Sequence, residues 1–235
     1  VLTHNQSNID KVSFFMEECR AQGIKVLGPH VNESDQNFTV NEAGEIRFGL
    51  GAIKGTGESA VQAIIEERAE ADKFNDIFDF ASRVNLRTVN KKSFEALAKA
   101  GGFDSFADYH RRQYVEPDED GHSLIEKAIR YANKLQQEEA SSQASLFGGE
   151  GGGSVSKPRV GRIEPYGAIE KLNIEKEMVG LYITGHPLDQ YRFEMENLCT
   201  AKIGDLKEID RLRGRELKMG GIVSDVQHRL TKKGK

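Results

Sequence analysis

The chain has 235 residues, 37% of them hydrophobic and 30% charged, and its formal net charge is −4. This length suffices for one or two domains with a buried core. The net negative charge excludes a generally basic nucleic-acid coat, so any contact with DNA must come from local patches of positive charge. The two cysteines, Cys19 and Cys199, are far apart and lack CxxC spacing, which argues against a disulfide framework and a zinc site.

The N-terminal segment predicts a helix followed by short strands. Asn8 is a suitable N-cap for a helix over residues 8–22, and Gly23 follows its end. The apolar face of this helix would consist of Ile9, Val12, Phe15, Met16 and Cys19. Residues 24–27 predict a short apolar strand. A small hairpin is expected next, in which Phe38 and Val40 pair with Ile46 and Phe48 across the turn at 41–44.

The most informative segment is the glycine-rich stretch of residues 49–59, which leads directly into an amphipathic helix over residues 58–70. The helix signal at i, i+3, i+4 and i+7 is Val61, Ile64, Ile65 and the stem of Arg68. Glycines let the backbone adopt positive φ and approach a ligand closely, and the N–H groups at a helix start favour an anion. This layout is typical of a helix-hairpin-helix element, which holds a nucleic-acid phosphate without reading bases. The candidate phosphate-binding residues are Lys54, Gly55, Thr56, Gly57 and Ser59.

Two other phosphate-binding motifs fit this run less well. A P-loop needs Lys-Ser/Thr directly after its last glycine, whereas Glu58 follows Gly57 and would repel a triphosphate. A Rossmann fingerprint needs a different glycine spacing directly after a buried strand. An ordinary helix–helix turn without a ligand stays open as an alternative, because the local sequence does not decide between it and phosphate binding.

A second helical pair of similar size follows the first. Its first helix would bury Ile77, Phe78, Ala81 and Val84. Asn90 is the expected cap of the second helix, which Gly101-Gly102 ends, and Phe103 and Phe106 are expected to pack back onto it. The pair carries a local basic cluster, Arg83, Arg87, Lys91 and Lys92. Such a cluster is usually only a solvent-exposed face of a helix. Because this one lies close in sequence to a candidate phosphate-binding hairpin, we add four residues to the candidate DNA-binding residues: Arg87, Asn90, Lys91 and Lys92.

The C-terminal half alternates between helices and polar segments. Residues 122–139 predict a helix, and the Ser-, Gly- and Glu-rich residues 140–162 have the composition of a flexible linker. Within it lies the apolar pair Leu146-Phe147, which suggests a peptide that docks into a partner, with Gln143 as a polar contact; chance packing onto the chain's own helices is the alternative. The remaining expected elements are helices over 166–182 and 188–198 and a strand over 216–227.

We find no catalytic constellation in the sequence. Asp118-Glu119-Asp120 superficially resembles a two-metal carboxylate site, but it follows Pro117 in a polar turn and is expected to be a solvated loop. The six histidines are scattered without ligand spacing, so neither catalytic nor metal-binding residues are predicted. No run reaches transmembrane length and the chain opens without a signal peptide, so a cytoplasmic location and no membrane partner are expected.

Several segments together resemble one family, the alpha (catalytic) subunit of bacterial replicative DNA polymerase III, the C-family polymerases. The matching segments, in the family's order, are 8–12, 17–20, 31–34, 46–55, 89–92, 100–104 and 177–188. They cover nearly the whole chain. Gly51-Ala52-Ile53-Lys54-Gly55 together with Gly185-His186-Pro187-Leu188 makes the most specific combination.

The resemblance implies a mainly α (α+β) fold and a domain order. Residues 1–45 would end the fingers domain, 46–110 form a tandem helix-hairpin-helix module on duplex DNA, 111–139 a helix, 140–162 a linker with a clamp-binding peptide, 163–202 a helical connector, and 203–235 the beginning of an incomplete OB domain. Gln143, Leu146 and Phe147 would bind the beta sliding clamp. Ala144 departs from the Leu often seen at the second place of that motif, and Thr56 replaces the usual aliphatic residue of the hairpin.

The resemblance also implies that the full-length protein is a DNA-directed DNA polymerase. Its palm, with the aspartates that hold magnesium, would lie before Val1, so this part is expected to be inactive, to hold no cofactor and to bind duplex DNA, the clamp and other replicase subunits. Two alternatives from other classes stay open. One is a purely structural helical connector, and the other is a helix-hairpin-helix module of a DNA repair enzyme, which would need the catalytic constellation that we do not find.

Overall fold

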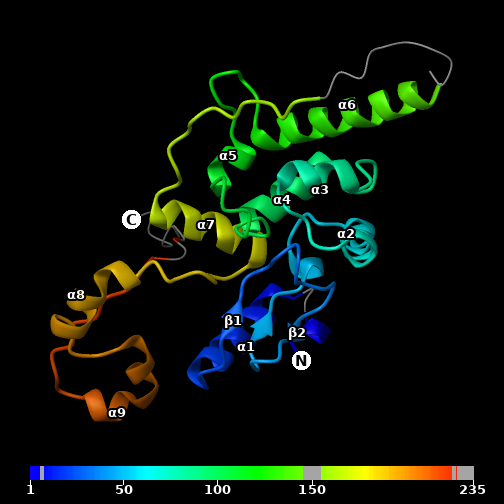
Figure 1. The fold of residues 1–235 in the computed structure, drawn as a ribbon. Coiled ribbons are helices and arrows are strands. Elements are labelled where there is room, and N and C mark those ends of the chain that lie inside the picture. The colour runs from blue at the N-terminus through cyan, green and yellow to red at the C-terminus, as the bar shows by residue number, and fades with distance from the viewer. Residues whose placement is uncertain (6–7, 145–154, 224–225, 227–235) are drawn as a thin grey trace, which may run out of the picture. The chain divides into compact units, whose positions relative to one another are not determined.

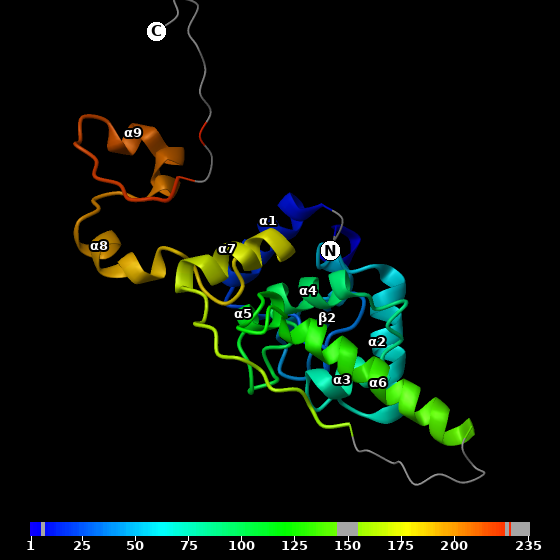
Figure 2. The same ribbon diagram turned by 90° about the horizontal axis from the view of Figure 1, so that it is seen from above.

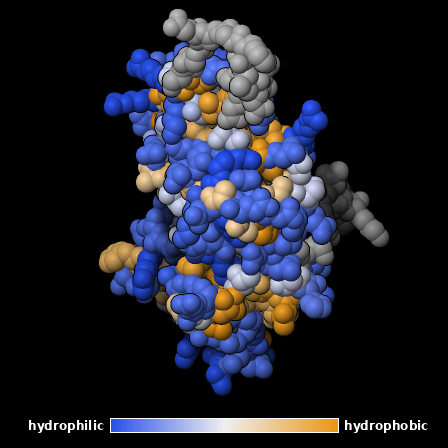
Figure 3. Space-filling view, turned by 45° about the vertical axis from the view of Figure 1, so that its right-hand side comes forward, coloured by the Kyte–Doolittle hydropathy of each residue, from blue (hydrophilic) through white to orange (hydrophobic). Residues whose placement is uncertain are grey.

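The computed structural model describes residues 1–5, 8–144, 155–223 and 226, with the side chains of Ile9 and residues 139–144 left aside. It divides into two units, Val1–Thr184 and Gly185–Lys235, which are described separately. The fold is mainly helical with one small three-stranded sheet, which confirms the predicted fold class (Figure 1). Hydrophilic side chains cover most of the face drawn in Figure 3, as expected for a chain with 30% charged residues.

The first unit opens with the short 3-10 helix η1 (Thr3–Asn5) and with α1 (Ile9–Ala21). The Asn8 side chain caps α1 as predicted, because its Oδ1 accepts a hydrogen bond from the N–H of Lys11. Gly23 follows at φ +74°, a conformation that suits glycine after a helix.

The sheet consists of β1 (Val26–Leu27), β2 (Thr39–Val40) and β3 (Ile46–Arg47), in the order β1-β3-β2. The hairpin of β2 and β3 is confirmed: Val40 lies opposite Ile46, and the rings of Phe38 and Phe48 meet edge to face at 4.8 Å. The parallel pairing of β1 with β3 was not predicted, because it joins segments separated in sequence.

Six helices and a 3-10 turn make up the rest of the first unit's regular structure. They are η2 (Leu50–Ala52), α2 (Glu58–Ala71), α3 (Ile77–Arg83), α4 (Lys91–Ala100), α5 (Arg111–Val115), α6 (Leu124–Ala144) and α7 (Ala168–Val179). Helix α3 packs against α6, and α4 packs against α5, α6 and α7, as both ribbon views show (Figures 1 and 2). Helix α4 is therefore the central helix of the unit.

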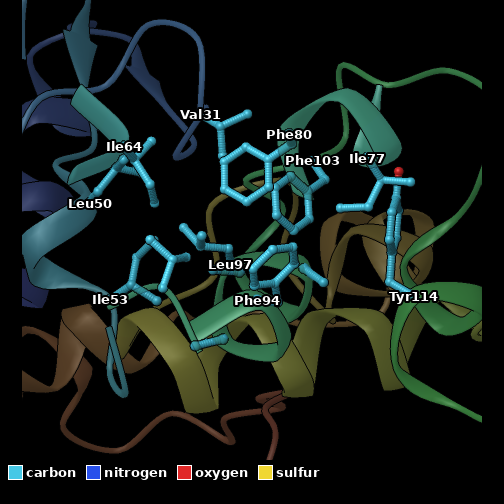
Figure 4. Close-up of a cluster of buried hydrophobic side chains, with 14 of the residues drawn as sticks. Val31, Leu50, Ile53, Ile64, Ile77, Phe80, Phe94, Leu97, Phe103 and Tyr114 are labelled. Atoms are coloured by element: carbon cyan, nitrogen blue, oxygen red, sulfur yellow. The ribbon is translucent and has the colours of Figure 1, made fainter. Parts of the chain in front are cut away.

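Aromatic side chains hold the helical pairs together. The ring of Phe80 on α3 meets those of Phe94 on α4 and Phe103 edge to face, at 5.0 and 5.1 Å between centroids. Leu50 and Ile64 from the first helical pair join the same core (Figure 4). Burial of large aromatic side chains is a dominant source of stability, so this cluster fixes the two helical pairs to each other.

Two predicted helix ends are wrong. Helix α6 continues to Ala144 instead of ending at 139, because the Gln-, Glu- and Ala-rich sequence after 135 favours helix over linker. Helix α7 ends at Val179 instead of 182. Gly180 adopts φ +82°, the left-handed conformation that terminates a helix.

Asp118 was predicted to lie in a solvated loop, and this is also wrong. Its side chain is only 4% exposed and accepts hydrogen bonds from Nζ of Lys127 at 2.6 Å and from the N–H of Gly161 at 2.8 Å. Residues 155–163, which we call the strap, are held along the helices by these bonds and by Nε2 of Gln113, which donates to the carbonyl of Gly161. The last part of the predicted linker is thus anchored to the fold.

A buried ion cluster joins α5 to α7. The guanidinium of Arg111 bonds both carboxylate oxygens of Asp104, at 2.6 to 3.1 Å, and Oε1 of Glu175 at 3.2 Å. The Glu175 side chain is 1% exposed, and its Oε2 accepts from the N–H groups of Ile183 and Thr184. Each charge of the cluster therefore has a partner, which buried charges require.

The second unit contains η3 (Asp189–Tyr191), α8 (Arg192–Asn197), η4 (Ile203–Glu208) and α9 (Ile209–Leu212). The strand predicted over 216–227 is not formed in its described part, 216–223 and 226. A strand needs a neighbouring strand to receive its backbone hydrogen bonds, whereas here the N–H groups of Thr200 and Ala201, which lie outside any strand, donate to the carbonyl of Lys218.

Replacing Arg111 tests the ion cluster. Arg111→Ala should lower the free energy of unfolding by about 3–5 kcal/mol, because it leaves the buried Glu175 carboxylate without its cation. Urea denaturation followed by circular dichroism measures this change. Arg112→Ala is the matched control: its partner Glu116 is partly exposed, so its midpoint should stay near that of the wild type. Equal, small effects of both changes would contradict the role given to Arg111.

Acid titration tests the strap anchor. Burial opposes ionisation of Asp118, but hydrogen bonds from Lys127 and from the N–H groups of Gly161 and Asp120 outweigh it and lower its pKa from 3.8 to about 2. The anchor therefore stabilises the fold fully above pH 3.8, and this contribution is lost as the pH falls to about 2. We expect the free energy of unfolding of Asp118→Asn to depend less on pH in this window. A slope equal to that of the wild type would show that Asp118 ionises normally.

Candidate nucleic-acid interface

The first hairpin joins η2 to α2 through residues 53–57. Gly55 lies at φ +95°, which only glycine adopts without strain. The N–H of Thr56 donates to the carbonyl of Ile53 at 3.3 Å, and its hydroxyl lies 2.7 Å from the same oxygen and 2.9 Å from the carbonyl of Leu50. The Thr56 side chain thus closes the turn from within, and the turn can offer a ligand its exposed backbone at Gly55 and Gly57.

Helix α2 begins at the end of this turn. Gly57 is its N-cap and supplies no side-chain acceptor, and the first N–H groups of any α-helix have no acceptor within the helix. The N–H groups of Glu58 and Ser59 stand in this position at an exposed helix end. Their partial positive charge suits an anion, although the Glu58 carboxylate in the same turn offsets part of it.

Gly55 of the hairpin faces α4. A Cβ added to Gly55 would lie 3.5 Å from the Cβ of Ala96 and 3.9 Å from Cε of Lys92. The Lys92 side chain therefore runs beside the turn that also carries Lys54. Both lysines are exposed, and within the described part of the chain neither forms an ion pair. The fold thus brings together two predicted DNA-binding lysines that are 38 positions apart in the sequence.

The second hairpin joins α3 to α4. The carbonyl of Asn85 accepts from the N–H groups of Thr88 and Val89, and its Oδ1 accepts from the N–H of Arg87. The Arg87 side chain is exposed and has no ion pair with any described carboxylate. Oδ1 of Asn90 caps α4 by accepting from the N–H of Ser93 at 3.2 Å, as predicted, which commits this oxygen to the helix.

A hollow of about 950 Å³ separates α2 from the second hairpin. Ser59 at the start of α2 and Arg87 with Thr88 on the hairpin line one part of it. Its other lining residues include the acidic side chains Glu66, Glu67 and Glu70 further along α2. An anion would therefore be favoured only near the Ser59 and Arg87 part, where the α2 N-terminus and a guanidinium both lie.

Two cations of the basic cluster, Arg83 and Lys91, form ion pairs with carboxylates of the chain. Arg83 is 3.0 Å from Glu67 and 3.4 Å from Asp79. Nζ of Lys91 is 2.7 Å from Glu126 and 3.6 Å from Glu95, and the hydrogen bond to Glu126 raises the pKa of Lys91. Among the predicted DNA-binding residues, the cations that lack a described ion-pair partner are Lys54, Arg87 and Lys92.

Sequence reasoning missed one residue that positions the first hairpin. The N–H of Lys54 donates to the carbonyl of Met178, at the end of α7, at 2.9 Å. Met178 is buried. No local signal could have indicated this contact, because a backbone carbonyl is available at every residue and the two positions are far apart in sequence.

The predicted clamp-binding residues lie at the end of α6 and beyond it. Gln143 is the next-to-last residue of α6, while Leu146 and Phe147 lie outside the described residues. In the described part of the chain, no group of three or more His, Cys, Asp or Glu side chains is arranged to hold a metal ion, and no helix there is both long and apolar enough to cross a membrane.

Comparison with known proteins agrees with this arrangement. A family model described as a helix-hairpin-helix motif matches residues 23–114, which include both hairpins. Proteins named DNA polymerase III subunit alpha are similar along most of the chain. The relative from Pseudomonas aeruginosa is 36% identical over 220 residues, covering 88% of this chain and 18% of the relative.

Two further relatives match the chain from end to end. That from Deinococcus radiodurans is 38% identical over 243 residues, 100% of this chain and 17% of the relative. That from Haemophilus influenzae is 34% identical over 236 residues, 100% of this chain and 19% of the relative. The chain therefore spans less than a fifth of the length of these relatives. With these relatives and the helix-hairpin-helix match over 23–114, the chain belongs to the family of DNA polymerase III alpha subunits.

Proposed function

We propose that this part of the protein holds duplex DNA by its phosphates, without reading the base sequence. The observation that carries the proposal is the position of Gly55 beside Ala96 and Lys92 of α4, which brings Lys54, Lys92 and the N-terminus of α2 to one turn. Backbone N–H groups and lysines are the groups that contact phosphate oxygens in nucleic-acid complexes. The match to a helix-hairpin-helix model over both turns supports this function.

The binding strength would come from few contacts and would depend strongly on salt. Each phosphate neutralised by a lysine or arginine releases counterions, so the logarithm of the binding constant falls with the logarithm of salt concentration by about 0.9 per contact. Only three candidate cations, Lys54, Arg87 and Lys92, lack ion-pair partners in the described part of the chain. We therefore expect weak binding to duplex DNA by this part alone.

We further propose that Gln143, Leu146 and Phe147 bind the beta sliding clamp, a proposal that rests on the family resemblance. Helix α6 supports it, because its last described side chains, from Gln136 to Glu138, are exposed and the helix carries the chain outward from the packed residues before Asn133. Weak contacts with DNA and one peptide contact with the clamp would then reinforce each other through effective concentration.

For the whole protein we propose template-directed DNA synthesis, together with other replicase subunits, as the names of its relatives imply. The chain spans less than a fifth of those relatives, so its own contribution would be to keep DNA and clamp attached during synthesis. We derive no catalytic step from the residues described.

Two adjacent lysines give a matched test of the DNA contact. Lys92→Gln should weaken binding to a fluorescently labelled duplex and reduce the magnitude of its salt slope by about 1, because one phosphate contact is lost. Lys91→Gln should change the binding less, since Glu126 and Glu95 already neutralise Lys91. Fluorescence anisotropy at two salt concentrations measures both effects.

Lys54→Glu serves as the stronger variant of the same test, with an expected loss of about tenfold in affinity at low salt. If duplex binding persists unchanged in Lys54→Glu and Lys92→Gln, the hairpins are a structural connector and the proposal is wrong. A loss that differs between DNA sequences would contradict a contact with phosphates only.

The clamp proposal has its own test. The double change Leu146→Ala and Phe147→Ala should abolish binding to the cognate sliding clamp in surface plasmon resonance, because an apolar anchor is lost. Duplex binding should stay at the wild-type level in the same variant. Retained clamp affinity would refute the assignment of these residues.

A further inference from the structure

A second group of cations lies away from both hairpins, where the strap passes α6. The two segments enclose a hollow of about 300 Å³. Helix α6 contributes Arg130, Tyr131 and Lys134, and the strap contributes Val155, Pro158 and Arg159. None of these residues belongs to the proposed duplex interface.

The cations that line the hollow differ in whether they form ion pairs. Lys127 also lines it, but its Nζ is held by Asp118 at 2.6 Å, by Asp120 at 2.8 Å and by the carbonyl of Arg159 at 2.9 Å. Both nearby aspartates pair with this one lysine, and Asp120, which also lines the hollow, keeps part of its negative charge exposed. Within the described chain, no carboxylate lies within ion-pair distance of Arg130, Lys134 or Arg159, and all three side chains are exposed. Three unpaired cations around one hollow create a local positive field in a chain of net charge −4.

The walls of the hollow are fixed by the fold. Nζ of Lys157 is 2.5 Å from Asp76 and 5.6 Å from the centre of the Phe78 ring, which holds the strap against the start of α3. The Lys127 bond to the Arg159 carbonyl fixes the strap against α6. Tyr131 is half-buried and meets Phe78 edge to face at 5.5 Å. The hollow is thus lined by an aromatic side chain in a defined position and by cations from two elements.

We propose that this hollow binds a single strand of nucleic acid, with a phosphate between Arg130, Lys134 and Arg159 and a base or sugar against Tyr131. Guanidinium groups match phosphate oxygens in geometry and charge. Cations combined with an aromatic side chain are the usual means of holding single strands without sequence preference. The volume lies at the small end of ligand-sized sites, which suits one nucleotide of a strand.

The test uses the whole chain and three labelled probes: a blunt duplex, the same duplex with a single-stranded extension, and the single strand alone. The double change Arg130→Glu and Arg159→Glu should weaken binding of the single strand and of the extended duplex about tenfold and reduce the magnitude of the salt slope by about 2. Binding of the blunt duplex should not change. Lys54→Glu should weaken binding of the blunt and the extended duplex and leave binding of the single strand unchanged, so the failure of one site is distinguishable from the failure of the other.

Lys11→Glu is the control for added negative charge, because Lys11 is exposed on α1 and lines neither hollow. The thermal unfolding midpoint should be the same in all variants, and Arg130→Lys with Arg159→Lys should restore part of the single-strand affinity. Wild-type single-strand binding in the double glutamate variant would overturn the proposal. An equal loss for blunt duplex would also overturn it, and so would tighter binding of polyglutamate than of the single strand, which would assign the hollow to an acidic protein.

Discussion

The contact of the first hairpin with α4 is the constraint on which the proposed interface depends. Gly55 has no side chain, and a Cβ at its position would lie within van der Waals distance of Ala96 and of the Lys92 stem. Helix α4 is in turn fixed by Phe94, whose ring meets Phe80 and Phe103 in the core. A side chain at position 55 would strain the turn, because its φ of +95° suits only glycine, and the close-packed aromatic core fixes the helix that the turn faces.

The fold divides its positive charges between structure and surface. Arg83, Arg111 and Lys127 each meet two carboxylates, and these pairs join helices or hold the strap. A cation fixed in this way cannot also neutralise a phosphate without breaking a partly buried ion pair, which costs more than an exposed contact returns. The cations proposed to bind a ligand lie on the two hairpins, in the first turn of α4, on α6 and on the strap. This division explains how an acidic chain can still present two separate basic surfaces.

Much of the local structure follows from the sequence alone. Asn8 and Asn90 cap their helices where expected, and Gly101 ends α4 in the left-handed conformation. The hairpin of β2 and β3 has its predicted register. Each of these features depends on residues only a few positions apart, so the chemistry that decides it is visible in a short stretch of sequence. The strand predicted over 216–227 shows the limit, because alternation of apolar residues cannot supply the neighbouring strand that a ladder needs.

The candidate nucleic-acid interface also depends partly on local sequence and partly on tertiary contacts. The sequence by itself determined that residues 54–59 form a glycine turn before a helix and that a second turn precedes α4. It also determined that basic residues gather at the second turn. Propensity, capping and charge are properties of neighbouring residues, so a short stretch of sequence decides them. Only the tertiary structure decided which of those basic residues are free. Lys91 and Lys92 are equivalent in sequence, yet Glu126 on α6 neutralises one while the other lies beside Gly55. Asp118 lies in a stretch with the composition of a solvated loop. Its side chain is nevertheless buried and accepts hydrogen bonds from Lys127 and from the distant backbone N–H of Gly161. Contacts between segments far apart in the chain depend on how helices pack, and that packing is set by the whole core.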